Sequence, residues 1–140
     1  MVIHKIAFAD FEKQIQKTHK SSFEPLGSEN GKVYVVAITR DGCPACEKQK
    51  PKMEKLAKEM LKKHGEKVTF TQIRVRHPTE KNAESLRSKD VLGHYFYPTN
   101  LIIVRTKDRG AIELYKTVSP RMSELKRNIE LAVKIAEALT

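Results

Sequence analysis

The apolar run at residues 33–38, Val-Tyr-Val-Val-Ala-Ile, is the feature that most constrains how this chain can fold. The run is nearly continuous and rich in β-branched residues, without the polar alternation of a half-exposed strand. A strand of this kind is buried on both faces, which requires helices on both sides of its sheet. Because 140 residues suit one hydrophobic core, we expect a single domain over residues 1–140.

Hydrophobic spacing places the other elements around this strand. Apolar residues at helical spacing after the cysteines predict one long amphipathic helix, and Gly65 is expected to cap it in the left-handed conformation. Alternation of helices and strands early in the chain, followed by a hairpin, predicts an α/β three-layer sandwich with a mixed sheet of four to five strands. The predicted strands are 68–75, 101–104 and 111–118, with a short additional one at 2–6, and the predicted helices are 8–19, 48–63, 78–90 and 119–139. The stripe of the long helix consists of Met53, Leu56, Ala57, Met60 and Leu61.

A Cys-x-x-Cys motif, Cys43-Pro44-Ala45-Cys46, directly follows the buried strand and a short turn. At the first turn of a helix the backbone N–H groups lack partners and favour negative charge, so a Cys43 thiolate should be stabilised there. Pro44 suits this turn because its missing N–H would find no helical acceptor, and Ala45 adds no bulk. We expect Cys43 to be the nucleophile of thiol–disulfide exchange and Cys46, lying deeper, to be the resolving thiol.

Two other roles for the cysteine pair compete with redox exchange. The pair could be half of a zinc site, but there is no third cysteine and no His-x3–5-His pair among the five histidines, so no metal is expected. The pair could also be buried and inert. A purely stabilising disulfide is disfavoured, because so short a loop restrains little unfolded-chain entropy. The order strand, turn, Cys-x-x-Cys, helix favours redox chemistry, and without a glycine-rich nucleotide loop no cofactor is expected.

The charge balance bears on partners and location. The formal net charge is +10, from 27 Lys and Arg against 17 Asp and Glu. This excess indicates a solvated surface or an acidic partner, whereas the scarcity of aromatic residues and the lack of a nucleic-acid-binding motif argue against nucleic acid. No apolar stretch is long enough to cross a membrane, and the N-terminus lacks the layout of a secretory signal, so we expect a cytoplasmic protein, monomeric and away from membranes.

From about residue 33 to residue 125 the chain resembles the thioredoxin family. Besides the cysteine motif, Pro51 stands eight residues after Cys43, where the family has a helix-kinking proline. The segment Tyr97-Pro98-Thr99, before an apolar strand, is similar to the family's cis-proline loop. The resemblance implies a thioredoxin-like fold and a cis bond before Pro98. It also implies that this loop lies beside the cysteines, with Tyr97 and Pro98 contacting the peptide substrate.

The chain departs from the family pattern around the cysteines. Gly42 replaces the usual Trp, and Pro44-Ala45 replaces Gly-Pro, although we expect these residues still to support the active site. Proline after the first cysteine is more typical of glutaredoxins and periplasmic disulfide oxidases, but no glutathione-binding Gly-Gly-x-x-Asp element follows Pro98. The family's buried acid corresponds to Ala37, and its lysine partner aligns with Gln72, which implies slower resolution by the second cysteine.

Residues near the motif are open to two interpretations. Tyr97 is bulkier than the family's usual residue, so it either borders the substrate groove or is an exposed tyrosine without a role. We expect Arg40 and Asp41 to be surface residues with mostly screened charges. His77 and His94 are expected in solvated loops near the cysteines.

The leading functional hypothesis is an oxidoreductase that reduces protein disulfides and is recycled by an unknown reductase or oxidant. The alternative is a thioredoxin-fold binding module, redox-inactive or dedicated to one partner, that recognises an acidic protein through the basic helix at 48–67. Retention of both cysteines favours the enzyme, since a binding module needs neither.

Overall fold

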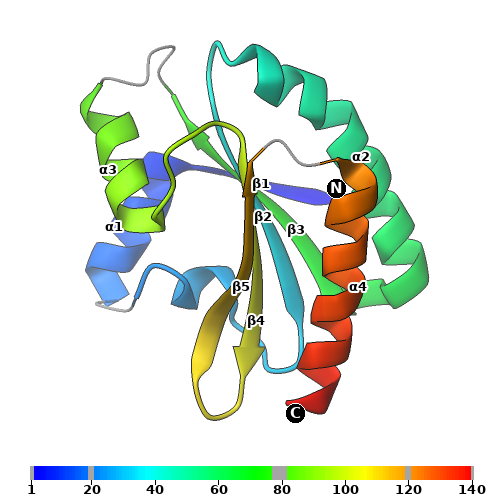
Figure 1. Ribbon diagram of the computed structural model, residues 1–140. Helices are drawn as coiled ribbons and strands as arrows, with labels where there is room; N and C mark the ends of the chain where they lie inside the picture. The colour runs from blue at the N-terminus through cyan, green and yellow to red at the C-terminus, as the bar shows by residue number, and fades with distance from the viewer. Residues whose placement is uncertain (1, 19–20, 77–81, 119–120, 140) are drawn as a thin grey trace.

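The structure is a computed structural model that describes residues 2–18, 21–76, 82–118 and 121–139. Strands and helices alternate through the first two thirds of these residues, and a hairpin and a helix complete them (Figure 1). The elements are β1 (Ile3–Ala7), α1 (Phe8–Thr18), η1 (Glu24–Leu26), β2 (Val33–Arg40), α2 (Pro44–His64), η2 (Gly65–Lys67), β3 (Val68–Val75), α3 (Ala83–Leu92), β4 (Thr99–Thr106), β5 (Gly110–Val118) and α4 (Met122–Ala138).

The strands form one mixed sheet in the order β1-β3-β2-β4-β5. β3 runs parallel to both β1 and β2, whereas β4 pairs antiparallel with β2 and β5. The additional strand expected near the N-terminus is therefore present as β1. β2 lies at the centre, and seven of its eight residues are buried, as its uninterrupted apolar sequence predicts.

Helices cover both faces of the sheet, which confirms the α/β three-layer sandwich. Figure 1 shows α2 and α4 on one side of the sheet and α1 and α3 on the other. Alternate residues of β2 point into the two resulting core clusters: Val35 packs with the α2 and α4 side, and Val36 with the α1 and α3 side. Cys43, Cys46 and Tyr97 belong to the second cluster, so the cysteine motif is continuous with the core.

The structure differs from the sequence-based expectation at the start of α3, at Gly65 and at Leu61. α3 begins at Ala83, with Asn82 as its side-chain cap, and the proposed start at Pro78-Thr79 lies outside the described residues. The expected Ser119-Pro120 cap of α4 also lies outside them. Gly65 has a positive φ of 60° but a ψ of −137°, so it is not in the left-handed helical conformation. Leu61, expected in the buried stripe of α2, is 47% exposed, whereas Met60 before it is fully buried, so the buried stripe ends at Met60.

The C-terminal half of α2, the helix that carries both cysteines at its other end, is fastened to α4. The carboxylate of Glu130 accepts hydrogen bonds from His64 at 2.9 Å and pairs with Lys63 at 3.1 Å. Lys126 donates to Glu59 at 3.0 Å, a second link between the two helices. Nearer the cysteines, Pro51 lies inside α2 at the position expected for a helix-interior proline.

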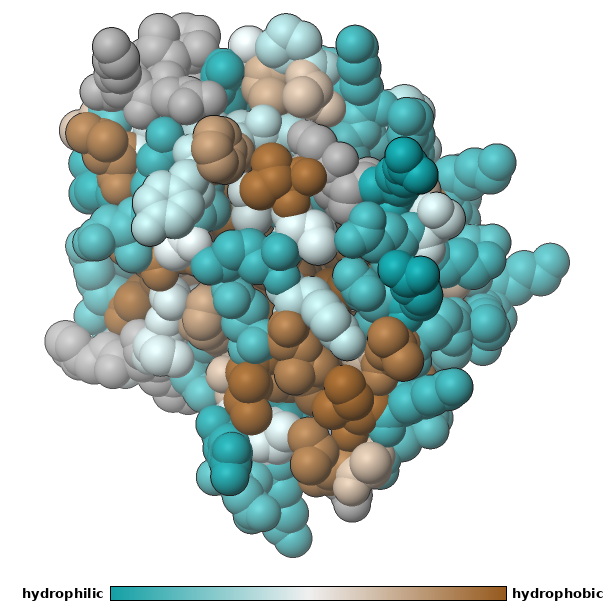
Figure 2. Space-filling model, in the orientation of Figure 1, coloured by the Kyte–Doolittle hydropathy of each residue, from teal (hydrophilic) through white to brown (hydrophobic). Residues whose placement is uncertain are grey.

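Among the described residues, no helix combines the length and the apolar character needed to cross a bilayer. Figure 2 shows a largely hydrophilic surface on the side it presents, with apolar side chains gathered between β5 and α4.

The link at Glu130 predicts a pH-dependent stability. Burial disfavours the charged carboxylate, but the hydrogen bonds from His64 and Lys63 outweigh it, so the pKa of Glu130 lies below its usual value. A carboxyl pKa lowered by folding contributes stability above the unfolded-state pKa of about 4.3 and loses that contribution as the pH falls through the folded-state pKa. Glu130→Gln should therefore reduce the free energy of unfolding in urea at pH 7, and the two proteins should converge in acid. Substitution of the exposed Glu66 by Gln is the control. If the free energy of unfolding of Glu130→Gln were still lower than that of the unsubstituted protein at pH 3, the lowered pKa of Glu130 would not be the cause.

Candidate active site

Cys43 forms the N-cap of α2, as the motif predicts. Its Sγ accepts a hydrogen bond from the N–H of Cys46 at 3.1 Å, and its carbonyl accepts one from Glu47 at 3.1 Å. Gly42, before it, has a φ of 68°, a left-handed conformation that glycine adopts without strain. Pro44 is the first residue of the helix. This turn brings Cys43 and Cys46 together as a disulfide, with their Cα atoms 5.2 Å apart.

Both cysteines are buried to a similar degree. Cys43 is 3% exposed and Cys46 is 6% exposed, so the structure does not place Cys46 deeper than Cys43, contrary to the expectation. The reason is that the loop from α3 to β4 covers Cys43. Gly42 and Pro44 on either side of Cys43 are exposed, which places its sulfur just beneath the surface.

The loop that covers Cys43 contains the cis-proline. The Tyr97–Pro98 peptide bond is cis, the isomer that the resemblance implies. The carbonyl oxygen of Tyr97 lies 3.7 Å from Cys43 Sγ. In the disulfide this is a contact, because the sulfur has no proton; in the reduced protein the thiol can donate to that carbonyl.

The side chain of Tyr97 is buried, which excludes the interpretation as an exposed tyrosine. Its hydroxyl shares a hydrogen bond with Ser85 Oγ at 2.8 Å, and its ring meets His94 edge-on, with the centroids 4.9 Å apart. The cations of Arg40 and Lys89 lie over the ring at 5.9 and 5.8 Å from its centroid. The backbone of Tyr97, rather than its ring, therefore faces the cysteines.

His94 is buried as well, so the expectation that it is solvated is wrong. It is 1% exposed, shares a hydrogen bond with Ser88 Oγ at 2.8 Å and has its Nδ1 3.2 Å from the Phe96 carbonyl. The other histidine considered with it, His77, lies outside the described residues. A signal existed in the sequence: Ser85, Ser88 and Leu92 recur at helical spacing, which places two serines on the buried face of α3.

Sequence reasoning also missed two features of this loop and its surroundings. Tyr95 and Phe96 are 78% and 61% exposed, immediately before the cis-proline segment. Behind the cysteines, the buried amides of Gln49 and Asn100 exchange two hydrogen bonds, at 3.0 and 2.8 Å, which join α2 to β4. Asn100 follows Pro98 by two residues, so this pair ties the cysteine helix to the strand that carries the cis-proline.

The neighbourhood of Cys46 lacks the acid found in the family. Ala37 lies opposite Gln72 in the β2–β3 register, so the two residues that the resemblance aligns with the family's acid and lysine are neighbours in the sheet. The Gln72 amide donates to Thr39 Oγ1 at 2.9 Å. Asp41, expected to be a screened surface residue, is half-buried and binds Arg74 through both carboxylate oxygens, at 2.6 and 3.2 Å. This hydrogen bond and the charge of Asp41 raise the pKa of the Arg74 guanidinium.

The arrangement brings together the groups that thiol–disulfide exchange requires. In the described ranges, no group of three or more His, Cys, Asp or Glu side chains could hold a metal ion. The site therefore consists of a disulfide at a helix N-terminus, a cis-proline loop against it, and buried hydrogen bonds that hold both.

Comparison with known proteins identifies the fold. No protein-family model matches the chain, and no curated protein matches it either. Among solved structures, thioredoxin f2 of Chlamydomonas reinhardtii is similar at 16% identity with a TM-score of 0.61, over 92% of this chain and 94% of that one. Thioredoxin f of spinach chloroplasts gives 19% identity and a TM-score of 0.60, over 93% and 85%. Fasciola hepatica thioredoxin gives 22% and 0.55, over 92% and 98%. The fold is that of thioredoxins.

The buried hydrogen bond between Tyr97 and Ser85 predicts that removal of the Tyr97 hydroxyl lowers stability, whereas removal of the Tyr95 hydroxyl does not. Tyr97→Phe removes the hydroxyl and leaves Ser85 Oγ buried without that partner, so the free energy of unfolding should fall by about 1–3 kcal/mol. Tyr95→Phe is a matched control, because its hydroxyl is on an exposed side chain and the change should stay within about 0.5 kcal/mol. Urea denaturation measures both. Equal effects of the two substitutions would contradict a structural role for the Tyr97 hydroxyl.

Proposed function

We propose that this chain, whose fold is that of thioredoxins, is a thiol–disulfide oxidoreductase that reduces disulfide bonds in other proteins. The observation that carries the proposal is the Cys43–Cys46 disulfide at the N-terminus of α2, closed against the cis-proline loop. A disulfide across three residues does little for stability, so its position at a helix N-terminus, where a thiolate is favoured, points to chemistry.

The proposed reaction has two exchange steps. In the dithiol form, the Cys43 thiolate attacks one sulfur of a substrate disulfide, forms a mixed disulfide and releases the other substrate sulfur as a thiolate. The Cys46 thiolate then attacks Cys43 Sγ, releases the second substrate sulfur and leaves the protein as the disulfide. The N–H of Cys46 donates to Cys43 Sγ and stabilises negative charge on it.

The partners in this proposal are protein disulfides and a separate reductant that regenerates the dithiol. One of the similar solved structures is a thioredoxin f2 in complex with ferredoxin:thioredoxin reductase, matched at 15% identity with a TM-score of 0.58. By analogy, a protein reductase is one class of recycling partner for this chain. A reductive role further implies a reducing compartment, and we place the protein in the cytoplasm on that ground.

Substitution of each cysteine tests the roles separately. Cys46→Ser should stall with a substrate protein bonded to Cys43, because the thiolate that resolves the mixed disulfide is missing. Cys43→Ser should capture no substrate, because it lacks the thiolate that attacks the substrate disulfide. The variants are reduced, freed of reductant and incubated with native, disulfide-bonded insulin, and non-reducing electrophoresis together with insulin reduction assays measures both. Non-covalent binding of an acidic protein that survived in the double Cys43→Ser/Cys46→Ser variant, without insulin reduction in the unsubstituted protein, would instead identify a binding module.

The reduction potential of the Cys43–Cys46 pair tests the direction of the reaction. Equilibration against dithiothreitol buffers should give a value near −270 mV, roughly that of thioredoxin, if the chain is a reductase. A value of roughly −120 to −180 mV would contradict the reductive role and mark an oxidase or isomerase.

A further inference from the structure

The two halves of the site lie on different elements, so the distance between them depends on how those elements are held together. Cys43 caps α2, whereas the Tyr97 carbonyl belongs to the loop that leads through the cis-proline into β4. Cys43 Sγ lies 3.7 Å from that carbonyl oxygen. A shift of the first turns of α2 relative to β4 would change this distance directly.

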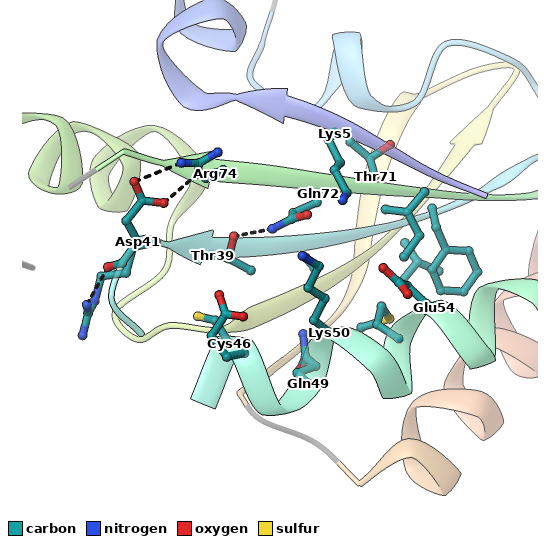
Figure 3. Close-up of a pocket in the computed structure, with 17 residues that line it drawn as sticks. Lys5, Thr39, Asp41, Cys46, Gln49, Lys50, Glu54, Thr71, Gln72 and Arg74 are labelled. Carbon is teal, nitrogen blue, oxygen red and sulfur yellow. Dashed lines mark hydrogen bonds and ion pairs between the residues drawn. The ribbon is translucent and has the colours of Figure 1, made fainter. Parts of the chain in front are cut away.

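Little packing holds the beginning of α2 in place. Of the helix residues before Pro51, all of which the structure describes, only Cys46 and Gln49 are buried. A cavity of about 230 Å³, lined in part by Gln49 and Lys50, lies between α2 and the strands β1, β2 and β3. Figure 3 shows Gln49 about one turn beyond Cys46, with Lys50 extending from α2 toward the sheet. The position of the turn that carries the cysteines therefore depends on few contacts.

The amide pair of Gln49 and Asn100 supplies a link at this point. Gln49 Nε2 donates to Asn100 Oδ1 at 3.0 Å, and Asn100 Nδ2 donates to Gln49 Oε1 at 2.8 Å. Both side chains are buried, and Asn100 lies opposite Ala37 in the β2–β4 register, where a small side chain leaves room for the amides. Asn100 is the second residue of β4, so the pair joins the cysteine helix to the strand that begins at the cis-proline loop.

The chemistry of the pair favours one relative position of helix and strand. Buried amides that lose their hydrogen bonds keep the cost of desolvation, so a shift that separates them is unfavourable. An apolar contact is less directional and loses less when the two elements slide past each other. A single buried polar pair specifies register in this way in coiled coils.

We propose that Gln49 and Asn100 are positioning residues for the first exchange step, and that they act by holding Cys43 in register with the Tyr97 carbonyl. This proposal rests on the proposed function of the cysteine pair. In that step the Cys43 thiolate bonds to one substrate sulfur, and the other substrate sulfur leaves as a thiolate. The reacting sulfurs must be aligned, so a substrate docked at the cis-proline loop reacts efficiently only when Cys43 is fixed relative to the same loop.

The test follows this step alone. Each variant is combined with Cys46→Ser, which leaves Cys43 as the one cysteine of the chain, and is reduced and freed of reductant before use. Formation of the mixed disulfide with native insulin is timed by acid quench and non-reducing electrophoresis. Alkylation by iodoacetamide is timed on the same samples, because it reports the reactivity of the Cys43 thiolate and needs no docked substrate.

The double variant Gln49→Met/Asn100→Leu replaces both amides by apolar groups of similar size and leaves neither amide unpaired, so it should fold. It should form the insulin adduct about tenfold more slowly or worse, because Cys43 is no longer held in register with the loop. Its alkylation rate should stay within about twofold, because the helix N-terminus that favours the thiolate is unchanged. Gln49→Asn, which withdraws the amide from Asn100 by one methylene group, is the milder variant and should slow adduct formation severalfold.

Ile129→Val, a core substitution on α4, is the control for a loss of stability away from the site, and it should change neither rate. Unchanged adduct formation in both amide variants would overturn the positioning role and leave the proposed function intact. A parallel loss of alkylation, or equal slowing in Ile129→Val, would also overturn it, because the cause would then be a general loss of folded structure. If the Cys46→Ser chain with both amides intact formed no adduct with insulin, the proposed function itself would fail, and this inference with it.

Discussion

The structure of the site depends on one junction, where the buried strand β2 ends and α2 begins. Because β2 is enclosed on both faces, its end is fixed in position by the core, and the two-residue turn after it places Cys43 at the cap of the helix. The Cys43 sulfur then replaces the oxygen of an ordinary capping residue as acceptor for the Cys46 N–H. One short segment thus supplies a hydrogen-bond acceptor for an N–H group at the start of the helix and holds the two sulfurs at bonding distance. The Gln49–Asn100 amide pair and the Glu130 contacts fix the rest of α2 relative to this point.

Much of this could be predicted from the sequence because it depends on neighbours along the chain. The buried strand and the helix after the cysteines both follow from local patterns of apolar residues, whereas the pairing of Ala37 with Gln72 is expected only from the family resemblance. What could not be predicted arises where separate segments meet. The burial of His94 requires a serine on α3 and a carbonyl within its own loop, and the relative exposure of the two cysteines depends on how far that loop extends over Cys43. A cavity between α2 and the strands β1, β2 and β3 is bounded by all four elements, so no single pattern in the sequence predicts it.

The loop before the cis-proline combines a rigid interior with an apolar exterior. His94 and Tyr97 point inward and are hydrogen-bonded to the serines of α3, while Tyr95 and Phe96 between them point outward. Because the first and the last of these four side chains are held by buried hydrogen bonds, the segment presents the two aromatic side chains between them beside the disulfide. The same fastening fixes the Tyr97 carbonyl against Cys43. The geometry at the Cys43 sulfur therefore depends on buried hydrogen bonds between this loop and α3.

Pro51 interrupts the backbone hydrogen bonding of α2 between the turn that carries the cysteines and the rest of the helix. Without an N–H at this position, the carbonyl of Glu47 has no partner in the ladder of the helix, so the cysteine-bearing turn is joined to the remainder by fewer hydrogen bonds than a regular helix would supply. We therefore expect the first turn to open locally more readily than the C-terminal part, which is linked to α4. Amide protons before residue 51 should then exchange with solvent faster than those beyond it. Such an opening would free the turn that carries Cys43 and Cys46 while the rest of α2 stays folded.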